Sequence, residues 1–221
     1  MPRSSASAGA AQTSFLVSRK QLHRVPDGLP LDHAVLAEPL AVGVHAAGLW
    51  DDLEDVPVIG GGIIGLCLLA ALKARGAGRV TVIGPVASKR ARALRLGAAE
   101  AVAPGALAPI PRFTACFDIV AAQATADLAG AAVLSGGAVA MMGVASGPLR
   151  FDTPRMQRFE ITLKGSGMYL GADIAEALRL LAAGAVDPTV FVTGIRPLDE
   201  AVAAYADAEL PDNVKTLIRM S

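Results

Sequence analysis

The sequence has few aromatic residues, few charges and only two cysteines. Aromatic residues make up 4% of the 221 residues, and charged residues make up 18%. Basic and acidic side chains balance to a formal net charge of zero. The sequence also lacks a stripe of basic residues interleaved with aromatic ones, which is the usual footprint of a nucleic-acid-binding surface. We therefore expect no nucleic-acid partner.

The two cysteines, Cys67 and Cys116, lie far apart in the sequence. Neither has a second cysteine or a histidine at the spacing of a metal site, and two isolated cysteines do not make a disulfide framework. We expect two thiols buried in the core of a protein that resides in a reducing compartment. The expected location is the cytoplasm.

Hydrophobic residues are abundant, at 53% of the chain, and the mean hydropathy is +0.48. This composition excludes an intrinsically disordered chain. Because aromatic residues are scarce, small aliphatic residues must build the core, which is typical of a parallel sheet covered on both faces. Two uncharged stretches, 56–72 and 128–149, approach the roughly 20 residues that span a membrane. Glycines at turn positions divide both stretches, so we expect no membrane segment.

Strand and helix patterns alternate along most of the chain, and repeated βα units predict a doubly wound parallel sheet, the α/β Rossmann arrangement. Strands are predicted at residues 56–59, 80–83, 117–120, 138–144, 160–164, 190–195 and 214–219, and helices at 63–75, 87–96, 124–134, 172–183 and 198–206.

The first part of the chain follows a different pattern. Residues 14–25 alternate weakly between apolar and polar, which predicts a strand that ends at the turn 26–28. Residues 31–49 predict a helix that is interrupted at Pro39. Residues 1–12 are rich in serine and alanine and predict a disordered start, although a transit peptide has a similar composition.

The motif with the clearest chemistry is Gly60-x-Gly62-x-x-Gly65, which lies between a predicted strand and a predicted helix. In this context the three glycines allow a tight turn, a close approach to a pyrophosphate and close packing of the helix on the strand. The backbone amides of Ile63 and Ile64 then face the phosphates. The pattern predicts a dinucleotide site. A simple turn in a glycine- and alanine-rich chain is the alternative.

The end of the second predicted strand indicates which dinucleotide binds. A carboxylate there would bind the ribose 2′-hydroxyl of NAD, but this strand ends at Gly84. Ser88, Lys89 and Arg90 follow within a turn. The missing acid and the nearby cations favour the 2′-phosphate of NADP, and NAD stays as the second choice. A solvated basic helix face that binds nothing is also compatible with this pattern.

Several segments together carry a family resemblance. They are 22–30, 37–46 with Glu38-Pro39-Leu40, 60–65, 96–98, 163–166 and 197–201. With these segments the chain resembles, over nearly its whole length, the zinc-type medium-chain alcohol and polyol dehydrogenases, which include sorbitol and threonine dehydrogenases. The resemblance implies an oxidoreductase that transfers a hydride between NAD(P)(H) and an alcohol or ketone. It also implies a homodimer, for which 191–195 is a candidate edge strand.

The resemblance also implies roles for individual residues. Glu38 is similar to a glutamate that lies near the catalytic zinc in polyol dehydrogenases, and a structural role at the end of a helix is the alternative. Val144, Gly165 and Ser166 fall where backbone groups of the family approach the nicotinamide. His45 is not a ligand position in the family, so we interpret it as structural.

The sequence departs from this family ahead of the glycine motif. The family's GroES-like catalytic domain supplies a cysteine zinc ligand and a Gly-His-Glu segment, and this chain has no cysteine before Cys67. We interpret residues 1–28 as a disordered start with the last strand of that domain, and 29–221 as the Rossmann domain with a C-terminal helix and strand.

This departure determines what we expect of the zinc site. The family implies zinc, but this chain lacks the zinc ligands, so we expect it not to be catalytically competent alone. The alternative is a non-catalytic NADP-binding or interaction protein, a degenerate relative of the dehydrogenases.

Overall fold

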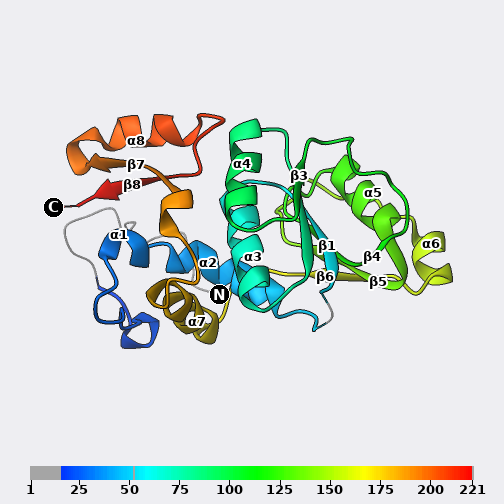
Figure 1. The fold of residues 1–221 in the computed structure, drawn as a ribbon, viewed down its shortest axis with the longest axis horizontal. Helices are drawn as coiled ribbons and strands as arrows, with labels where there is room; N and C mark the ends of the chain where they lie inside the picture. Colours follow the sequence, from blue (N-terminus) through cyan, green and yellow to red (C-terminus); the bar gives the residue numbers. More distant parts are fainter. Residues whose placement is uncertain (1–15, 52, 221) are drawn as a thin grey trace.

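The computed structural model describes residues 16–51 and 53–220, and a six-stranded parallel sheet forms its centre (Figure 1). The strand order is β3-β2-β1-β4-β5-β6. This arrangement confirms the predicted Rossmann fold. The strands are Asp55–Ile59 (β1), Arg79–Ile83 (β2), Glu100–Val102 (β3), Phe113–Asp118 (β4), Val133–Met141 (β5) and Thr162–Gly165 (β6).

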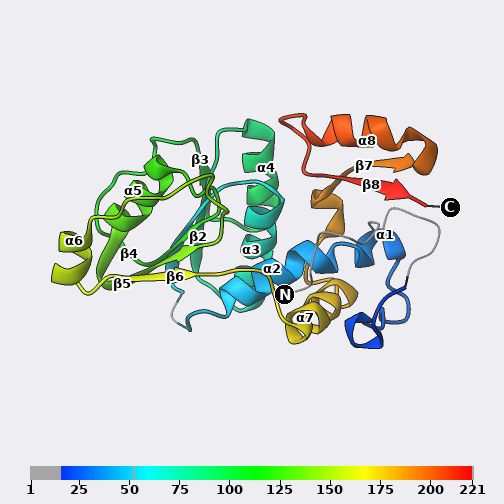
Figure 2. The same ribbon diagram turned by 180° about the vertical axis from the view of Figure 1, so that it is seen from behind.

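Helices cover both faces of this sheet (Figures 1 and 2). Alternate strand residues belong to different clusters, because successive side chains point to opposite faces. Val56 and Val58 pack with helix α3 (Ile63–Ala74), whereas Ile59 packs with helix α5 (Gln123–Ala132). The helices are Leu31–Ala34 (α1), Ala37–Ala47 (α2), Ile63–Ala74 (α3), Ala87–Arg95 (α4), Gln123–Ala132 (α5), Thr153–Arg158 (α6), Gly171–Ala182 (α7) and Ala201–Ala208 (α8).

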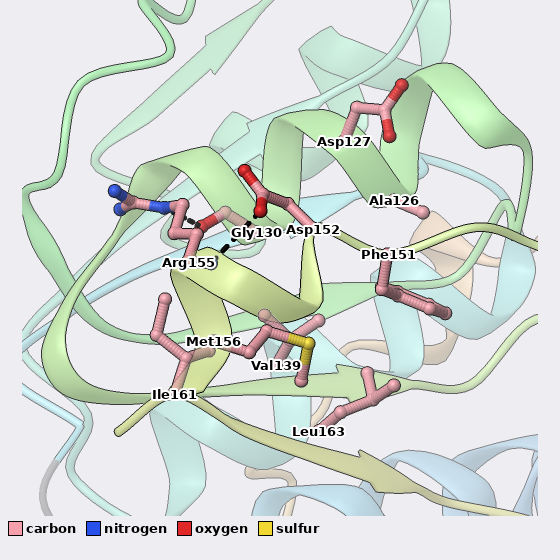
Figure 3. A pocket seen from close by; sticks show the side chains of 10 residues that line it. All are labelled: Ala126, Asp127, Gly130, Val139, Phe151, Asp152, Arg155, Met156, Ile161 and Leu163. Atoms are coloured by element: carbon pink, nitrogen blue, oxygen red, sulfur yellow. Dashed lines mark hydrogen bonds between the residues drawn. The ribbon is translucent and has the colours of Figure 1, made fainter. Parts of the chain in front are cut away.

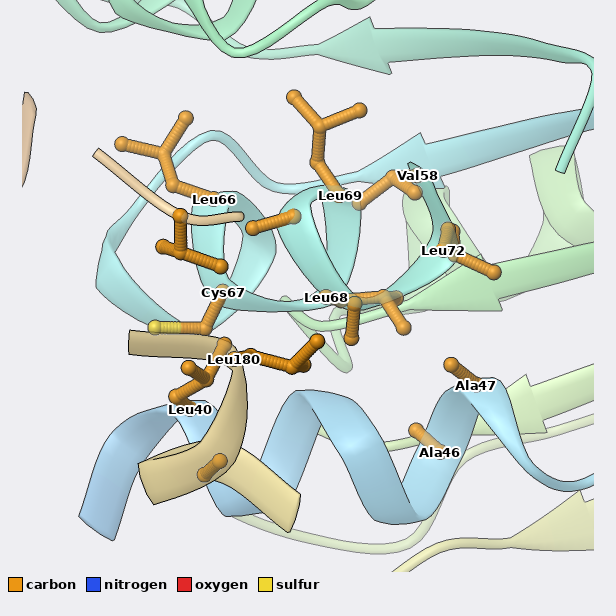
Figure 4. Packing of buried hydrophobic residues seen from close by; sticks show 14 of the residues in the cluster. Leu40, Ala46, Ala47, Val58, Leu66, Cys67, Leu68, Leu69, Leu72 and Leu180 are labelled. Carbon is orange, nitrogen blue, oxygen red and sulfur yellow. The ribbon is translucent and has the colours of Figure 1, made fainter. Parts of the chain in front are cut away.

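Helix α3 is the most deeply buried of these helices, and its leucines point in every direction around its axis (Figure 4). Leu40 of α2 and Leu180 of α7 pack against α3 on the side where Cys67 lies. Burial on all sides fixes the position of the helix, and with it the position of the glycine turn at its N-terminus.

The last two strands, Val192–Pro197 (β7) and Lys215–Arg219 (β8), form a separate parallel sheet. Helix α8 connects these two strands. The sequence did not indicate this separation. The candidate edge strand 191–195 lies in this second sheet, where β7 pairs only with β8 within the described ranges. Phe191 is buried and precedes β7, while β3 and β6 are the outer strands of the central sheet.

Two predictions near the N-terminus were wrong. Over its described part, 16–25, the predicted strand is replaced by the 3-10 helix Arg19–Gln21 (η1), because Ser18 and Gln21 form a capping box around that turn. The helical region breaks at Val35 and Leu36 rather than at Pro39. Pro39 lies in the first turn of α2, where a missing N–H costs no intrahelical bond. The predicted start at 1–12 lies outside the described residues.

Some strand ends and short elements also differ from the prediction. Strand β3 and helix α6 were not predicted, and β4 ends at Asp118 instead of residue 120. The Asp118 carboxylate accepts the amides of Val120 and Ala121 and so turns the chain away from the sheet. Within the described ranges, no helix is both long enough and apolar enough to cross a membrane.

Candidate functional site

The carboxyl ends of the parallel strands meet at one edge of the sheet. Strands β1 and β4 are neighbours there, and the connections from them run to opposite faces. Such a switch point leaves a crevice outside the strand ends, where open α/β sheets bind ligands. The turn at Gly60 lies in this position, because its amide donates to the Ile83 carbonyl of β2 at 2.8 Å. On its other side, the Ile119 amide donates to the Ile59 carbonyl at 2.9 Å.

The three glycines of the turn have the roles that phosphate binding requires. Gly60 has φ +122°, a conformation that L side chains rarely adopt. A Cβ on Gly65 would lie 1.8 Å from the Gly60 carbonyl oxygen, so α3 packs directly on the turn. A Cβ on Gly62, in contrast, would meet nothing within 4 Å. The space above Gly62 is open.

The N-terminus of α3 is available to a ligand. Gly62 is its N-cap residue, and no side chain caps the first turn. The first amides of a helix have no intrahelical partner and carry the positive end of the helix dipole. An open, uncapped helix start next to a glycine turn therefore fits a pyrophosphate group.

The residues after β2 lie beside the glycine turn. A Cβ on Gly84 would lie 3.3 Å from the Gly61 nitrogen, which places Gly84 against the glycine turn. Lys89 is half-buried on the same side. The Arg90 guanidinium, however, donates to the carbonyls of Gly84 and Pro85, both at 2.8 Å.

Ser88 also has a partner that its sequence position did not indicate. Its hydroxyl donates to the Asp212 carboxylate at 2.6 Å. The sequence interpretation placed three free polar side chains after β2. In the structure two of the three are already engaged.

The ends of β5 and β6 carry the residues expected near the nicotinamide. The Ser166 amide donates to the Met141 carbonyl at 2.9 Å, so Gly165 and Ser166 lie at the same edge of the sheet as the glycine turn. The Ser166 side chain is buried, and its hydroxyl has no hydrogen-bond partner among the described residues. Val144 follows β5 and is 96% exposed.

Sequence reasoning missed Asp118 at the end of β4. This carboxylate is fully buried. One oxygen accepts the amides of Val120 and Ala121 at 2.9 and 3.1 Å, and the other accepts the Thr125 hydroxyl at 2.8 Å. These bonds hold the 119–121 turn against Gly60. The only sequence signal for this role was the position of Asp118, an acidic residue at the end of the apolar run 115–117.

Glu38 and His45 face the segment that follows β6, but they do not form a catalytic cluster with it. Glu38 is exposed, and its charge adds to burial in raising the pKa of Tyr169. The His45 Nδ1 atom lies 3.0 Å from a carboxylate oxygen of Asp173, which also accepts the Leu170 amide. This pair connects α2 to the start of α7, which is the structural role expected of His45.

The described residues do not fit a zinc ion. Cys67 and Cys116 are both buried, and burial raises the pKa of each thiol far above its usual range. Zinc binds thiolates rather than thiols. Over 16–51 and 53–220, no three His, Cys, Asp or Glu side chains come together as a ligand set. We therefore derive no chemical step through zinc.

A cavity on the opposite face of the sheet is too small for a cofactor. It lies between α5, α6 and the last two strands of the central sheet, and its volume is about 50 Å³ (Figure 3). Its walls are mostly apolar, with Val139, Met156 and Leu163 pointing into it and two carboxylates at its rim. The Arg155 side chain turns instead to backbone carbonyls at the end of α5. This cavity therefore does not serve as a dinucleotide site.

A substitution in α5 beside this cavity is expected to raise stability. Gly130 lies inside α5 and lines the cavity, and a Cβ there would meet nothing within 4 Å. We expect Gly130→Ala to raise the free energy of unfolding by about 0.5–1 kcal/mol, because alanine favours the helix over glycine by that amount. Thermal unfolding measures the change.

The matched control is Gly147→Ala in an exposed loop, where a Cβ also meets nothing within 4 Å. Both changes restrict the unfolded chain, so the difference between them reports the helix and the cavity. A lower melting temperature for Gly130→Ala than for the control would contradict the open space at Gly130.

Comparisons with known proteins agree with this geometry. A family profile described as zinc-binding dehydrogenase matches residues 64–183. The chain is 30% identical to 2-dehydro-3-deoxy-L-galactonate 5-dehydrogenase of Pseudoalteromonas atlantica, over 95% of this chain and 64% of that protein. The chain therefore spans less than two thirds of the relative's length.

Two solved structures are similar in fold. L-idonate 5-dehydrogenase from Escherichia coli superposes with a TM-score of 0.86 at 21% identity, covering 93% of this chain and 62% of that one. A Sinorhizobium meliloti protein, assigned as a zinc-binding dehydrogenase and bound to NADP, gives 0.84 at 25% identity, with coverages of 92% and 64%. With more than half of its residues matched by the profile, the chain belongs to the zinc-binding dehydrogenase family.

Proposed function

We propose that this chain is the cofactor-binding part of an oxidoreductase that transfers a hydride between NAD(P)(H) and an alcohol or ketone. The observation that carries the proposal is the uncapped start of α3 at Gly62, open to solvent and set against the Gly60 turn. Backbone amides of Ile63 and Ile64 would bind the pyrophosphate there. The P. atlantica and E. coli relatives are named as dehydrogenases, which supports the same reaction class.

NADP is the proposed cofactor, with NAD as the alternative. The strand β2 ends at Gly84 without its own carboxylate, and Lys89 lies beside the glycine turn. This cation favours binding of a phosphorylated ligand. The NADP bound to the S. meliloti relative supports the choice.

The nicotinamide would lie at the ends of β5 and β6. A bound nicotinamide supplies or accepts the hydride. Gly165 leaves open space, and the Ser166 hydroxyl is a buried group that still needs a hydrogen-bond partner. These residues, with Val144, would bind and orient the ring through their backbone groups.

We propose that the described residues bind the cofactor without catalysing hydride transfer alone. An alkoxide that develops during hydride transfer needs a Lewis acid or a proton donor. The described side chains form no zinc ligand set, and His45 is held by Asp173. A non-catalytic NADP-binding or interaction protein is the second candidate, favoured by the same lack of ligands.

We further propose a homodimer and a cytoplasmic location. Strand β7, which contains most of the candidate edge 191–195, pairs only with β8 within the described ranges. An outer strand of this kind presents unpaired backbone groups to a second copy. The location rests on two free, buried cysteines, which suit a reducing compartment.

Titration with NADPH, followed by nicotinamide fluorescence, tests the proposal. We expect saturable binding at submillimolar concentration and no oxidation of sorbitol or other polyols by the purified chain. The absence of binding at millimolar NADPH would contradict the cofactor role. Metal-free turnover of an alcohol by the purified chain would contradict the claim that the described residues do not catalyse the reaction alone.

A further inference from the structure

We propose that Asp212 weakens the preference for NADP over NAD by acting against a 2′-phosphate at the ribose end of the proposed site. The proposal rests on the proposed function, because it concerns the dinucleotide that the glycine turn would bind. Asp212 lies in the turn between α8 and β8, far from the glycine motif in sequence.

The Asp212 carboxylate reaches the first turn of α4. One of its oxygens accepts the Ser88 hydroxyl at 2.6 Å, across 124 residues of sequence. Ser88 is the second residue of that helix, directly after the loop that leaves β2. The fold thus brings a carboxylate to a position where the end of β2 itself has none.

This position borders the proposed ribose site. Gly84 packs against Gly61 of the glycine turn, and the Arg90 guanidinium connects α4 to the Gly84 carbonyl. The first turn of α4 therefore lies one short loop away from the phosphate-binding turn. In dinucleotide-binding sheets, an acid at the end of the second strand accepts the ribose 2′-hydroxyl. Asp212 presents the same chemical group from another part of the chain.

The charges around Asp212 leave it free to act on a ligand. Asp212 is exposed and forms no ion pair within the described part of the chain. Arg90, two residues after Ser88 on α4, is held by two carbonyls. A carboxylate accepts a hydrogen bond from a 2′-hydroxyl but repels a 2′-phosphate, which carries up to two negative charges. Asp212 therefore opposes the NADP preference that Lys89 and Arg90 would otherwise give.

The test compares the dissociation constants of NADH and NADPH for the full chain and for Asp212→Asn. Asparagine retains an acceptor for the Ser88 hydroxyl, so the turn keeps its contact while the charge is removed. We expect NADPH to bind about tenfold more tightly relative to NADH in Asp212→Asn. The gain should shrink at high salt, because exposed charges are screened.

Two further variants separate this effect from a change in net charge or fold. Glu209→Gln removes the same charge three residues earlier, at an exposed side chain without a hydrogen bond or ion pair in the described ranges. It should leave the ratio unchanged, and Asp212→Glu should stay near the wild-type ratio.

An unchanged ratio in Asp212→Asn, or an equal shift in Glu209→Gln, would overturn the proposal while both cofactors still bind. If neither cofactor binds the wild-type chain, the proposed function fails instead, and the role of Asp212 fails with it.

Discussion

Gly65→Ala is expected to destabilise the protein by about 3 kcal/mol or more and to abolish NADPH binding. The added Cβ would lie 1.8 Å from the Gly60 carbonyl oxygen and 2.9 Å from its carbon. Both are backbone atoms of a tight turn, so they cannot move aside as a flexible side chain would. Overpacking of this kind typically costs about 1–3 kcal/mol and sometimes more, since the backbone itself must shift. Urea denaturation measures the change in stability.

Gly62→Ala is the matched control for this prediction. A Cβ on Gly62 meets no protein atom within 4 Å, so the fold should keep its stability. Its methyl group would, however, occupy the space into which a pyrophosphate must come. We expect normal unfolding and weak binding for Gly62→Ala. Wild-type stability for Gly65→Ala would contradict the close packing of α3 on the turn.

Asp118→Ala is expected to cost about 2–4 kcal/mol, with a melting temperature roughly 5–15 °C lower. The fully buried carboxylate accepts the amides of Val120 and Ala121 and the Thr125 hydroxyl. Alanine leaves these donors without an acceptor, and buried unsatisfied donors are costly. Because the same turn contacts Gly60, cofactor affinity should fall as well. Thermal unfolding and NADPH titration measure the two effects.

Asp118→Asn separates the hydrogen bonds from the charge. The asparagine carbonyl can still accept the two backbone amides, so this variant should lose less than half of the stability that Asp118→Ala loses. Equal losses in both variants would show that the negative charge, rather than the acceptor geometry, holds the turn. That result would contradict the account given for the end of β4.

Sequence patterns predicted the central sheet and the glycine turn because these features depend on local signals. Apolar runs such as 56–59 mark buried strands, and the spacing of Gly60, Gly62 and Gly65 between a predicted strand and a predicted helix is typical of a phosphate-binding turn. The assignment of β7 and β8 to a second sheet was not predictable. Their residue pattern indicates a strand but does not specify its partner.

Other details depend on contacts between residues far apart in sequence. The Ser88–Asp212 bond crosses 124 residues, so the carboxylate beside α4 has no local signal. The sequence correctly indicated that β2 ends without an acid, but it did not indicate that the last turn of the chain supplies one. The η1 turn at Ser18 and the end of β4 depend on single side-chain hydrogen bonds, which periodicity does not report.

The central claim is that the uncapped start of α3 binds the pyrophosphate of a nicotinamide dinucleotide. Parallel titrations of the wild-type chain and Gly62→Ala with NADPH, both shown to be folded by thermal unfolding, test it most directly. We expect saturable binding by the wild-type chain and at least tenfold weaker binding by Gly62→Ala at unchanged melting temperature. Equal affinities for the two proteins would contradict it.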